Sequence, residues 1–286
     1  MKLQPYKRFS RSRAGDVLYF LFLLSAGLFT ILPMIYSILT SFKPLDELMI
    51  FPPRFFVKRI TLSNYAELPA LLSNMGIPLS RYLFNSLFIS FGTMLLHIII
   101  ASLAAFVLSK TNFRLKGVIF LLVQFSLLYN AYTLAIPRYV IFSQLHMIDT
   151  YWVYILPYLP SGLGVFLMKQ YMDDSIPIPL IEAARMDGAG PFRIYRSIVM
   201  PIVKPVWLTL ALFSFRDMWS YQPQGTIFSE QLKTLPYVMS TISTGGIARS
   251  GSAMAATVLL MIPPVIVYMV SQSNVMKTMS SAGIKD

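Results

Sequence analysis

Long apolar runs separated by short charged segments form the main pattern of this chain. A helix needs roughly 20 apolar residues to cross a bilayer core about 30 Å thick, and six runs are long enough. They cover approximately residues 17–41, 85–108, 117–136, 150–168, 205–222 and 254–273. The pattern predicts an all-α, polytopic membrane protein with about six transmembrane helices. A tail of residues 1–16 precedes the transmembrane domain of residues 17–273, and a tail of residues 274–286 follows it.

Two of these runs contain residues that a simple lipid-facing helix avoids. The fourth run carries Pro157 and Pro160 followed by two glycines, and the fifth run carries Arg216 and Asp217. Broken or charged spans are tolerated where they face protein or water. We therefore expect both runs to line the protein interior or an aqueous path.

The composition agrees with a bilayer environment. Of the 286 residues, 56% are hydrophobic and only 13% are charged, whereas soluble domains carry roughly a quarter charged residues. The net charge of +12 could suggest nucleic acid, but the basic residues lie beside the apolar runs, which favours a positive-inside bias and excludes a nucleic-acid partner. The chain has no cysteine, so it has no disulfide and no thiolate metal site.

The distribution of lysine and arginine predicts the orientation. With the N-terminus inside, fifteen of these residues lie in cytoplasmic segments, eight lie outside, and Arg216 lies within a run. The first run is too long for a signal-peptide core and is expected to remain as an uncleaved span. The bias predicts that both termini are cytoplasmic.

The longest inner segment carries a helix-turn-helix pattern over residues 175–201. Pro177 suits a helix entry, Asp187-Gly188 is a turn signal, and Pro191 is placed to open a second helix. Apolar residues then recur at helical spacing and are expected to share one face: Phe192, Tyr195, Ile198 and Val199. One interpretation is a short helix-turn-helix on the inner membrane surface that docks on another protein, and the other is an ordinary amphipathic loop.

This segment resembles the signature of binding-protein-dependent ABC importer permeases, which reads Glu-Ala-Ala, three residues, Gly, nine residues and Ile-x-Leu-Pro. The matching residues are Glu182, Ala183, Ala184, Gly188, Ile198 and Pro201, with Met200 in place of leucine. The Asp187-Gly188 continuation is similar to the carbohydrate branch. The two alanines remove bulk, so the helix could enter a groove on another protein, and Glu182 could meet a basic residue there.

The resemblance to the maltose-type subunit extends over most of the chain. It includes Pro33, Ser41-Phe42-Lys43, Asn64-Tyr65, Leu232 to Pro236 and the tail Ser280 to Lys285. The pattern around Trp219 and Leu232 leans towards the subgroup that handles oligosaccharides from complex polysaccharides. Trp219 is followed by Ser220, where family members commonly have asparagine, so carried-over substrate contacts do not follow from the resemblance.

The resemblance implies a division of labour among several chains in a bacterial plasma (inner) membrane. A permease subunit of this type forms a heterodimer with a second homologous permease, couples to two copies of a cytoplasmic ATPase, and receives sugar from an extracytoplasmic binding protein. The ATPase-coupling residues would be Glu182, Ala183, Ala184, Asp187, Gly188 and Pro201. No Gly-Lys dipeptide occurs in the sequence, so a Walker A loop is absent. We therefore expect that this chain is not an enzyme and holds no cofactor. ATP and Mg would be bound by the partner ATPase.

Arg216 and Asp217 are the most conspicuous intramembrane residues. Each costs roughly 2.5–3.5 kcal/mol at the bilayer centre, so neither is expected to face lipid. Adjacent helical residues point about 100° apart, so the two are not expected to face one another. They could form an inter-helix ion pair with the partner permease, or line a sugar path together with Trp219, Ser220 and Tyr221.

Three further hypotheses concern polar groups in the runs. Asn130 in the third run is either glue between helices or a residue of the path. If Arg216 borders the path, its guanidinium would favour acidic sugars. The alternative function is a secondary transporter that uses Asp217 for ion coupling, but it leaves the Glu182–Pro201 motif unexplained.

Overall fold

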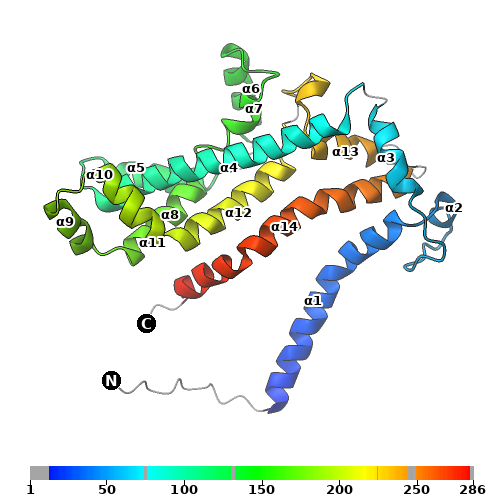
Figure 1. Cartoon of the computed structure of the whole chain (residues 1–286), viewed down its shortest axis with the longest axis horizontal. Coiled ribbons are helices and arrows are strands. Elements are labelled where there is room, and N and C mark those ends of the chain that lie inside the picture. The colour runs from blue at the N-terminus through cyan, green and yellow to red at the C-terminus, as the bar shows by residue number, and fades with distance from the viewer. Residues whose placement is uncertain are drawn as a thin grey trace. The chain divides into compact units, whose positions relative to one another are not determined.

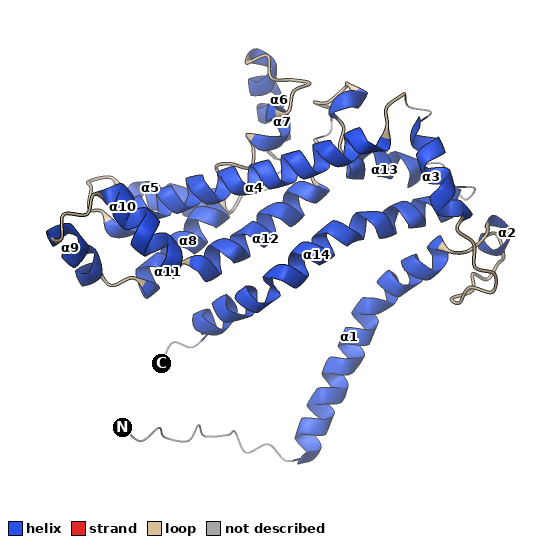
Figure 2. Cartoon of the chain, in the orientation of Figure 1, coloured by secondary structure: helices blue, strands red, loops and turns tan. Residues whose placement is uncertain are grey.

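The computed structural model describes residues 13–73, 76–129, 133–223, 225–243, 246 and 249–283, and these residues form helices joined by loops, with no strand among them (Figure 2). They belong to two compact units, each considered by itself. One unit comprises residues 1–68 and 242–259, and the other comprises residues 69–241 and 260–286. The all-α class expected from the apolar runs is confirmed.

The helices follow one another as labelled in Figure 1. In chain order they are α1 (Arg13–Ser41), α2 (Leu45–Leu48), α3 (Ser63–Ser73), α4 (Leu79–Lys110), α5 (Lys116–Ser126), α6 (Ala135–Gln144), α7 (Trp152–Ile155), α8 (Gly162–Ser175), α9 (Ile178–Met186), α10 (Pro191–Ile194), the π-helix η1 (Tyr195–Val199), α11 (Met200–Ile202), α12 (Lys204–Ser220), the 3₁₀-helix η2 (Glu230–Leu232), α13 (Leu235–Ser243) and α14 (Ser250–Gly283).

Among the described residues, three helices are long and apolar enough to cross a membrane alone. They are residues Gly15–Ser41 of α1, the whole of α4, and residues Ser250–Gln272 of α14, with mean hydropathies of 2.2, 2.3 and 2.2. Shorter elements occupy the other predicted spans. The fourth run is interrupted between α7 and α8, where Pro157 and Pro160 lie. Each proline removes a backbone N–H and its ring crowds the preceding turn, so two prolines three residues apart disfavour a continuous helix here. The total of six spans stays a prediction.

Residues from three parts of the first unit meet at Asn64. The buried Asn64 side chain donates from Nδ2 to the carbonyl oxygens of Ser41 and Lys43, at 2.8 Å each. The hydroxyls of Ser41 and Tyr65 are 2.7 Å apart. A Cβ added at Gly251 would lie 2.7 Å from Asn64 Cγ. The start of α14 can therefore lie this close to Asn64 only because residue 251 is glycine. The two motifs that suggested the maltose-type subunit therefore bind one another.

The second unit is organised around α4. Helices α8 and α12 both pack along α4, and Figure 1 shows α12 running beside it. Small residues permit this approach: a Cβ added at Gly164 of α8 would overlap His97 Nε2 and lie 3.2 Å from Ala101 Cβ. Close contact through small residues replaces the hydrophobic driving force that helices lack in lipid.

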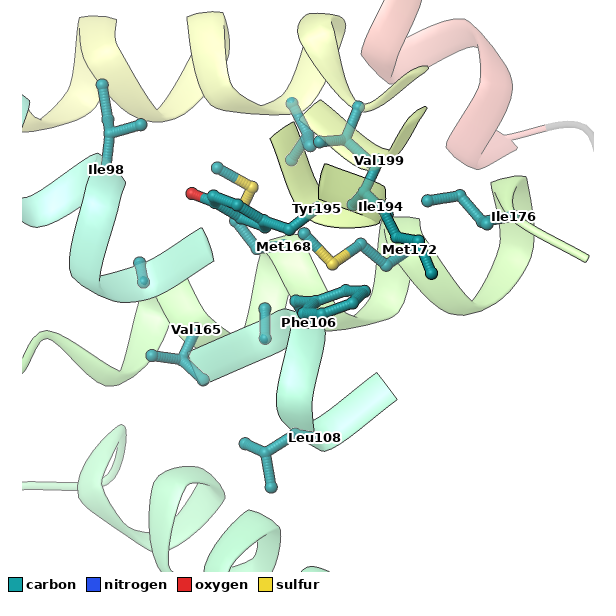
Figure 3. Close-up of a cluster of buried hydrophobic side chains, with 14 of the residues drawn as sticks. Ile98, Phe106, Leu108, Val165, Met168, Met172, Ile176, Ile194, Tyr195 and Val199 are labelled. Carbon is teal, nitrogen blue, oxygen red and sulfur yellow. The ribbon is translucent and has the colours of Figure 1, made fainter. Parts of the chain in front are cut away.

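One apolar cluster holds the predicted cytoplasmic segment to α4 and α8 (Figure 3). The cluster combines Phe106 of α4 and Met172 of α8 with Ile194, Tyr195 and Val199. The rings of Phe106 and Tyr195 lie 5.7 Å apart. The Tyr195 hydroxyl also lies 2.7 Å from the Ser102 hydroxyl of α4, so the polar end of this buried ring is paired. Apolar packing against α4 and α8 therefore holds the helix-turn-helix in place.

Candidate functional site

Helix α9 shows one side to the apolar cluster and the other to the surroundings. Ile181 and Ala184 are buried, with 3% and 8% of their surfaces exposed. Glu182 and Ala183 are exposed. The expectation that both alanines free the helix for a groove on another protein is therefore wrong for Ala184, which packs inside its own chain. Glu182 and Ala183 keep an exposed, carboxylate-bearing face.

The Asp187-Gly188 turn adopts the left-handed conformation that the sequence predicts. Gly188 has φ of +78°, a region where an L side chain is strained. The N–H of Gly188 donates to the Arg185 carbonyl and that of Ala189 to the Ala184 carbonyl, both at 3.0 Å. No atom lies within 4 Å of a Cβ added at Gly188. Backbone conformation alone, and no neighbouring atom, restricts this position to glycine.

The second helix of the segment departs from the predicted face. Pro191 opens α10 as expected, and Tyr195 and Val199 are buried. Phe192, however, is 67% exposed, and Ile194 is buried in its place. Residues 195–199 form a π-helix, whose wider turn changes the angular step between residues, so a 3.6-residue pattern does not identify one face. Phe192 remains as an exposed aromatic beside the turn.

Pro201 marks a sharp change of direction. The stretches Pro191–Ile202 and Lys204–Ser220 meet at 80°. Pro201 and Pro205 both lack the N–H that would continue the helical hydrogen bonds, which explains a bend at this point. The predicted coupling segment therefore leads into α12 through an elbow centred on Val203.

A cavity of about 670 Å³ lies at the C-terminal end of α12. Four of the predicted path residues line it, namely Arg216, Asp217, Ser220 and Tyr221. A fifth, Asn130, lies outside the described residues. Residues of α6 complete the wall, so the cavity joins segments about 80 positions apart in the sequence.

Arg216 and Asp217 pair with one another, contrary to the expectation from helix geometry. Arg216 Nε and Nη2 donate to Asp217 Oδ1 at 3.1 and 2.9 Å. The Cβ atoms do diverge on the helix, but the long arginine side chain bends back to its neighbour. The other carboxylate oxygen, Asp217 Oδ2, accepts a hydrogen bond from the Tyr158 hydroxyl at 3.1 Å. The acid is thus satisfied within this chain.

Trp219 does not line the cavity. Its side chain is buried at 3% exposure and stacks on Phe215, with ring centroids 5.8 Å apart and planes at 17°. Its indole N–H donates to the Leu260 carbonyl at 3.1 Å. In the structure this predicted path residue joins α12 to the second half of α14.

The cavity residues that the sequence reasoning missed include Arg138 and Tyr139 of α6. Arg138 was counted only as one of the outer basic residues. Its Nη1 donates to the Tyr221 hydroxyl at 3.4 Å. The signal was available in the amphipathic stretch 135–144, where charged and aromatic residues follow directly after the third apolar run.

A loop contact fixes the segment that follows α12 beside the cavity. The carboxylate of Asp149 accepts hydrogen bonds from the N–H groups of Phe228 and Ser229 at 2.9 Å each, and from the Ser229 hydroxyl. The Asp149 N–H donates to the carbonyl of Thr226, a cavity residue, at 2.9 Å. Burial raises the pKa of Asp149, but these donors outweigh it and hold the pKa below its ordinary value. We refer to this contact as the Asp149 clasp.

Known proteins resemble this chain in sequence and in fold. The arabinooligosaccharides transport system permease protein AraQ of Bacillus subtilis is 26% identical, over 99% of both chains. The sn-glycerol-3-phosphate transport system permease protein UgpE of Shigella flexneri is 32% identical, over 68% of this chain and 70% of its own length. A bacterial ABC transporter involved in the import of the acidic polysaccharide alginate has a chain with the same fold. Its TM-score is 0.78 at 21% identity, covering 94% of this chain and 99% of that one.

A family model also matches residues 97–281, which include α9, the Gly188 turn, the elbow and all the described cavity residues. The family is described as the binding-protein-dependent transport system inner membrane component. The match covers well over half of the chain, and the resemblance of the Glu182–Pro201 segment is thereby confirmed. This protein belongs to the family of binding-protein-dependent transport system inner membrane components.

Proposed function

We propose that this chain is a permease subunit of an ATP-driven importer for oligosaccharides in a bacterial plasma membrane. Family membership supports a membrane component that works with a binding protein and a separate ATPase. The relatives' names support the sugar: one transports arabinooligosaccharides, and a chain of the same fold belongs to an alginate importer. A cavity of about 670 Å³ falls in the range of ligand sites, roughly 300–1,000 Å³.

The proposal includes the other chains and their places. A second homologous permease forms a heterodimer with this one, and two copies of an ATPase bind ATP and Mg on the cytoplasmic side. This chain itself catalyses no reaction and holds no cofactor. Both of its termini are cytoplasmic, which puts the Gly188 turn inside and the loop around residue 228 outside.

One observation carries the proposal: the Gly188 turn is exposed, while the inner side of the same segment is fixed by the apolar cluster. Glu182 and Ala183 are displayed on α9, while Ile181 and Ala184 fix the opposite side of that helix in the apolar cluster. A force applied to the exposed side would therefore reach α4 and α8 instead of deforming a loose loop. Exposed Phe192 and Met186, at 67% and 88%, add apolar surface for an ATPase to cover.

Two glycines of this segment give a matched test. Gly188 has φ of +78°, whereas Gly190 has φ of −68°, and neither has an atom within 4 Å of an added Cβ. Strain of about 1–3 kcal/mol is expected for a side chain at Gly188 and none at Gly190. Gly188→Val should abolish uptake of a labelled arabinooligosaccharide or uronate oligosaccharide and uncouple ATP hydrolysis from the binding protein. Gly190→Val should take up the same oligosaccharide as the wild type does.

Membrane levels of both variants, measured by immunoblot, separate coupling from folding. Glu182→Lys should give the same loss as Gly188→Val without strain, because it reverses the charge of an exposed side chain. Normal uptake by Gly188→Val at normal membrane levels would contradict the coupling role.

The alternative, a secondary transporter with an ion at Asp217, has no observation in its favour. Arg216 and Tyr158 already occupy both carboxylate oxygens of Asp217. Within the described residues, no group of three or more His, Cys, Asp or Glu side chains could hold a metal ion.

A further inference from the structure

Two guanidinium groups line the cavity at the end of α12, and they differ in how their charges are compensated. Arg216 donates through Nε and Nη2 to Asp217, at 3.1 and 2.9 Å, so its charge is balanced within the same helix. The pair lies at the cavity wall with both members accessible, at side-chain exposures of 66% and 38%. Arg216 and Asp217 together contribute no net charge to the cavity.

Arg138 has no such carboxylate. Across the described part of the chain it forms no ion pair, and its Nη1 donates to the neutral hydroxyl of Tyr221 at 3.4 Å. The side chain is half-buried, so water compensates its charge only in part. The cavity therefore carries the uncompensated positive charge of Arg138.

The rest of the wall suits a sugar. Tyr139 and Tyr221 provide aromatic faces, and Ser220 and Gln222 provide hydroxyl and amide groups that exchange hydrogen bonds with sugar hydroxyls. The Tyr221 ring is itself supported edge-to-face by Tyr154, with centroids 6.3 Å apart. A planar guanidinium matches a planar carboxylate through two parallel hydrogen bonds.

We propose that Arg138 binds the carboxylate of an acidic sugar in this cavity, while the Arg216–Asp217 pair meets sugar hydroxyls. This inference rests on the proposed oligosaccharide import and specifies its substrate as a uronate-containing oligosaccharide. It transfers to Arg138 the role that the sequence had suggested for Arg216. The structural reason is that Arg216 already has a carboxylate partner and Arg138 does not.

A matched pair of substrates tests the proposal in the complete complex, reconstituted in proteoliposomes with its ATPase, partner permease and binding protein. One substrate is a uronate oligosaccharide, and the other is the same oligosaccharide with its carboxyl groups reduced to alcohols. Arg138→Gln should lower the ratio of acidic to neutral uptake by at least about tenfold, since a hydrogen bond to a charged group contributes enough energy for such a factor.

The matched control is the double variant Arg216→Gln/Asp217→Asn, which removes the pair without changing the net charge. It should lower uptake of both sugars by the same factor and leave their ratio unchanged. A selective loss of the acidic sugar in the double variant, or an equal loss of both sugars in Arg138→Gln, would overturn the assignment to Arg138.

A chemical rescue separates charge from packing, because the native chain has no cysteine. Arg138→Cys should regain acidic-sugar uptake after reaction with a cationic methanethiosulfonate, and should lose more of it after reaction with an anionic one. Equal effects of the two reagents would refute a charge role. If the wild-type complex carries the neutral sugar but not the uronate, the inference fails and sugar import stands. If it carries neither sugar while the binding protein stimulates its ATPase, sugar import itself fails.

Discussion

The segment of residues 175–201 and the cavity at the end of α12 are built in opposite ways. The first is one contiguous stretch whose inner side is fixed by apolar packing and whose outer side exposes both apolar and charged residues. The second gathers polar and charged groups from α6, α12 and the loop after α12, and hydrogen bonds hold those groups in place. Packing specifies a rigid shape, whereas the polar and charged groups of the cavity specify which chemistry can enter. A transport subunit needs both: a rigid surface for its motor and a selective surface for its substrate.

The proposed topology puts the segment of residues 175–201 and the cavity on opposite sides of the membrane. Cysteine labelling tests this with an all-or-none result. Met186 beside the Gly188 turn is 88% exposed, and Phe228 beyond the cavity is 63% exposed. An impermeant thiol reagent applied from outside to cells whose outer envelope admits it should label Phe228→Cys fully and Met186→Cys only after permeabilisation. Labelling of Met186→Cys in intact cells would invert the predicted orientation.

The contact between α4 and α8, against which the segment of residues 175–201 packs, should be sensitive to added volume. A methyl group at Gly164 would overlap His97, and such overpacking costs about 1–3 kcal/mol. Gly164→Ala should therefore lower the melting temperature of the detergent-solubilised permease. The control is Gly92→Ala on α4, where an added Cβ meets no atom within 4 Å and alanine favours the helix by up to about 1 kcal/mol. Equal melting temperatures for the two variants would show that α8 does not need its close approach to α4.

The hydrogen-bonded side should show the smaller effect and a dependence on pH. Because the folded-state pKa of Asp149 is lowered, the stability from its ionised form is present above the ordinary aspartate pKa. That stability is lost as pH falls through the folded-state pKa. Asp149→Asn keeps a residue that tolerates its φ of +60° but weakens the clasp at neutral pH.

Limited proteolysis of the loop at residues 225–229 measures this effect on the clasp. Cleavage should be faster in Asp149→Asn than in the wild type at pH 7, and the two rates should converge when an acid-stable protease is used well below the ordinary aspartate pKa. A difference in cleavage rate that stayed constant over that pH range would show that the ionised carboxylate of Asp149 does not hold the clasp.

Patterns that lie within one stretch of sequence could be predicted, and contacts between distant stretches could not. The Asp187-Gly188 turn and the Pro191 helix start follow from local backbone chemistry and are present as expected. The π-helix at Tyr195 was not foreseen, because a 3.6-residue pattern assumes a regular α-helix, and in the structure Phe192 is exposed and Ile194 is buried.

The cavity shows the same limit more clearly. Arg216, Asp217, Ser220 and Tyr221, which the sequence suggested for a sugar path, line one cavity, and their contact with substrate stays a prediction. Trp219 lies outside the cavity, and the hydrogen bond of its indole to the Leu260 carbonyl depends on α14, which is remote in sequence. Arg138 could be brought to Tyr221 only by the fold, since 83 positions separate the two residues.

The elbow at Val203 joins two helical stretches that run in different directions. The stretch Pro191–Ile202 and α12 meet at 80°, so under the proposed coupling role a push along the first stretch would swing α12 sideways. With a rise of 1.5 Å per residue, the 17 residues of α12 form a lever about 25 Å long. A swing of roughly 10° at the pivot would carry the far end through about 4 Å, from the same helix rise. Arg216 and Asp217 lie near that far end, so under the proposed coupling role such a swing would displace one wall of the cavity.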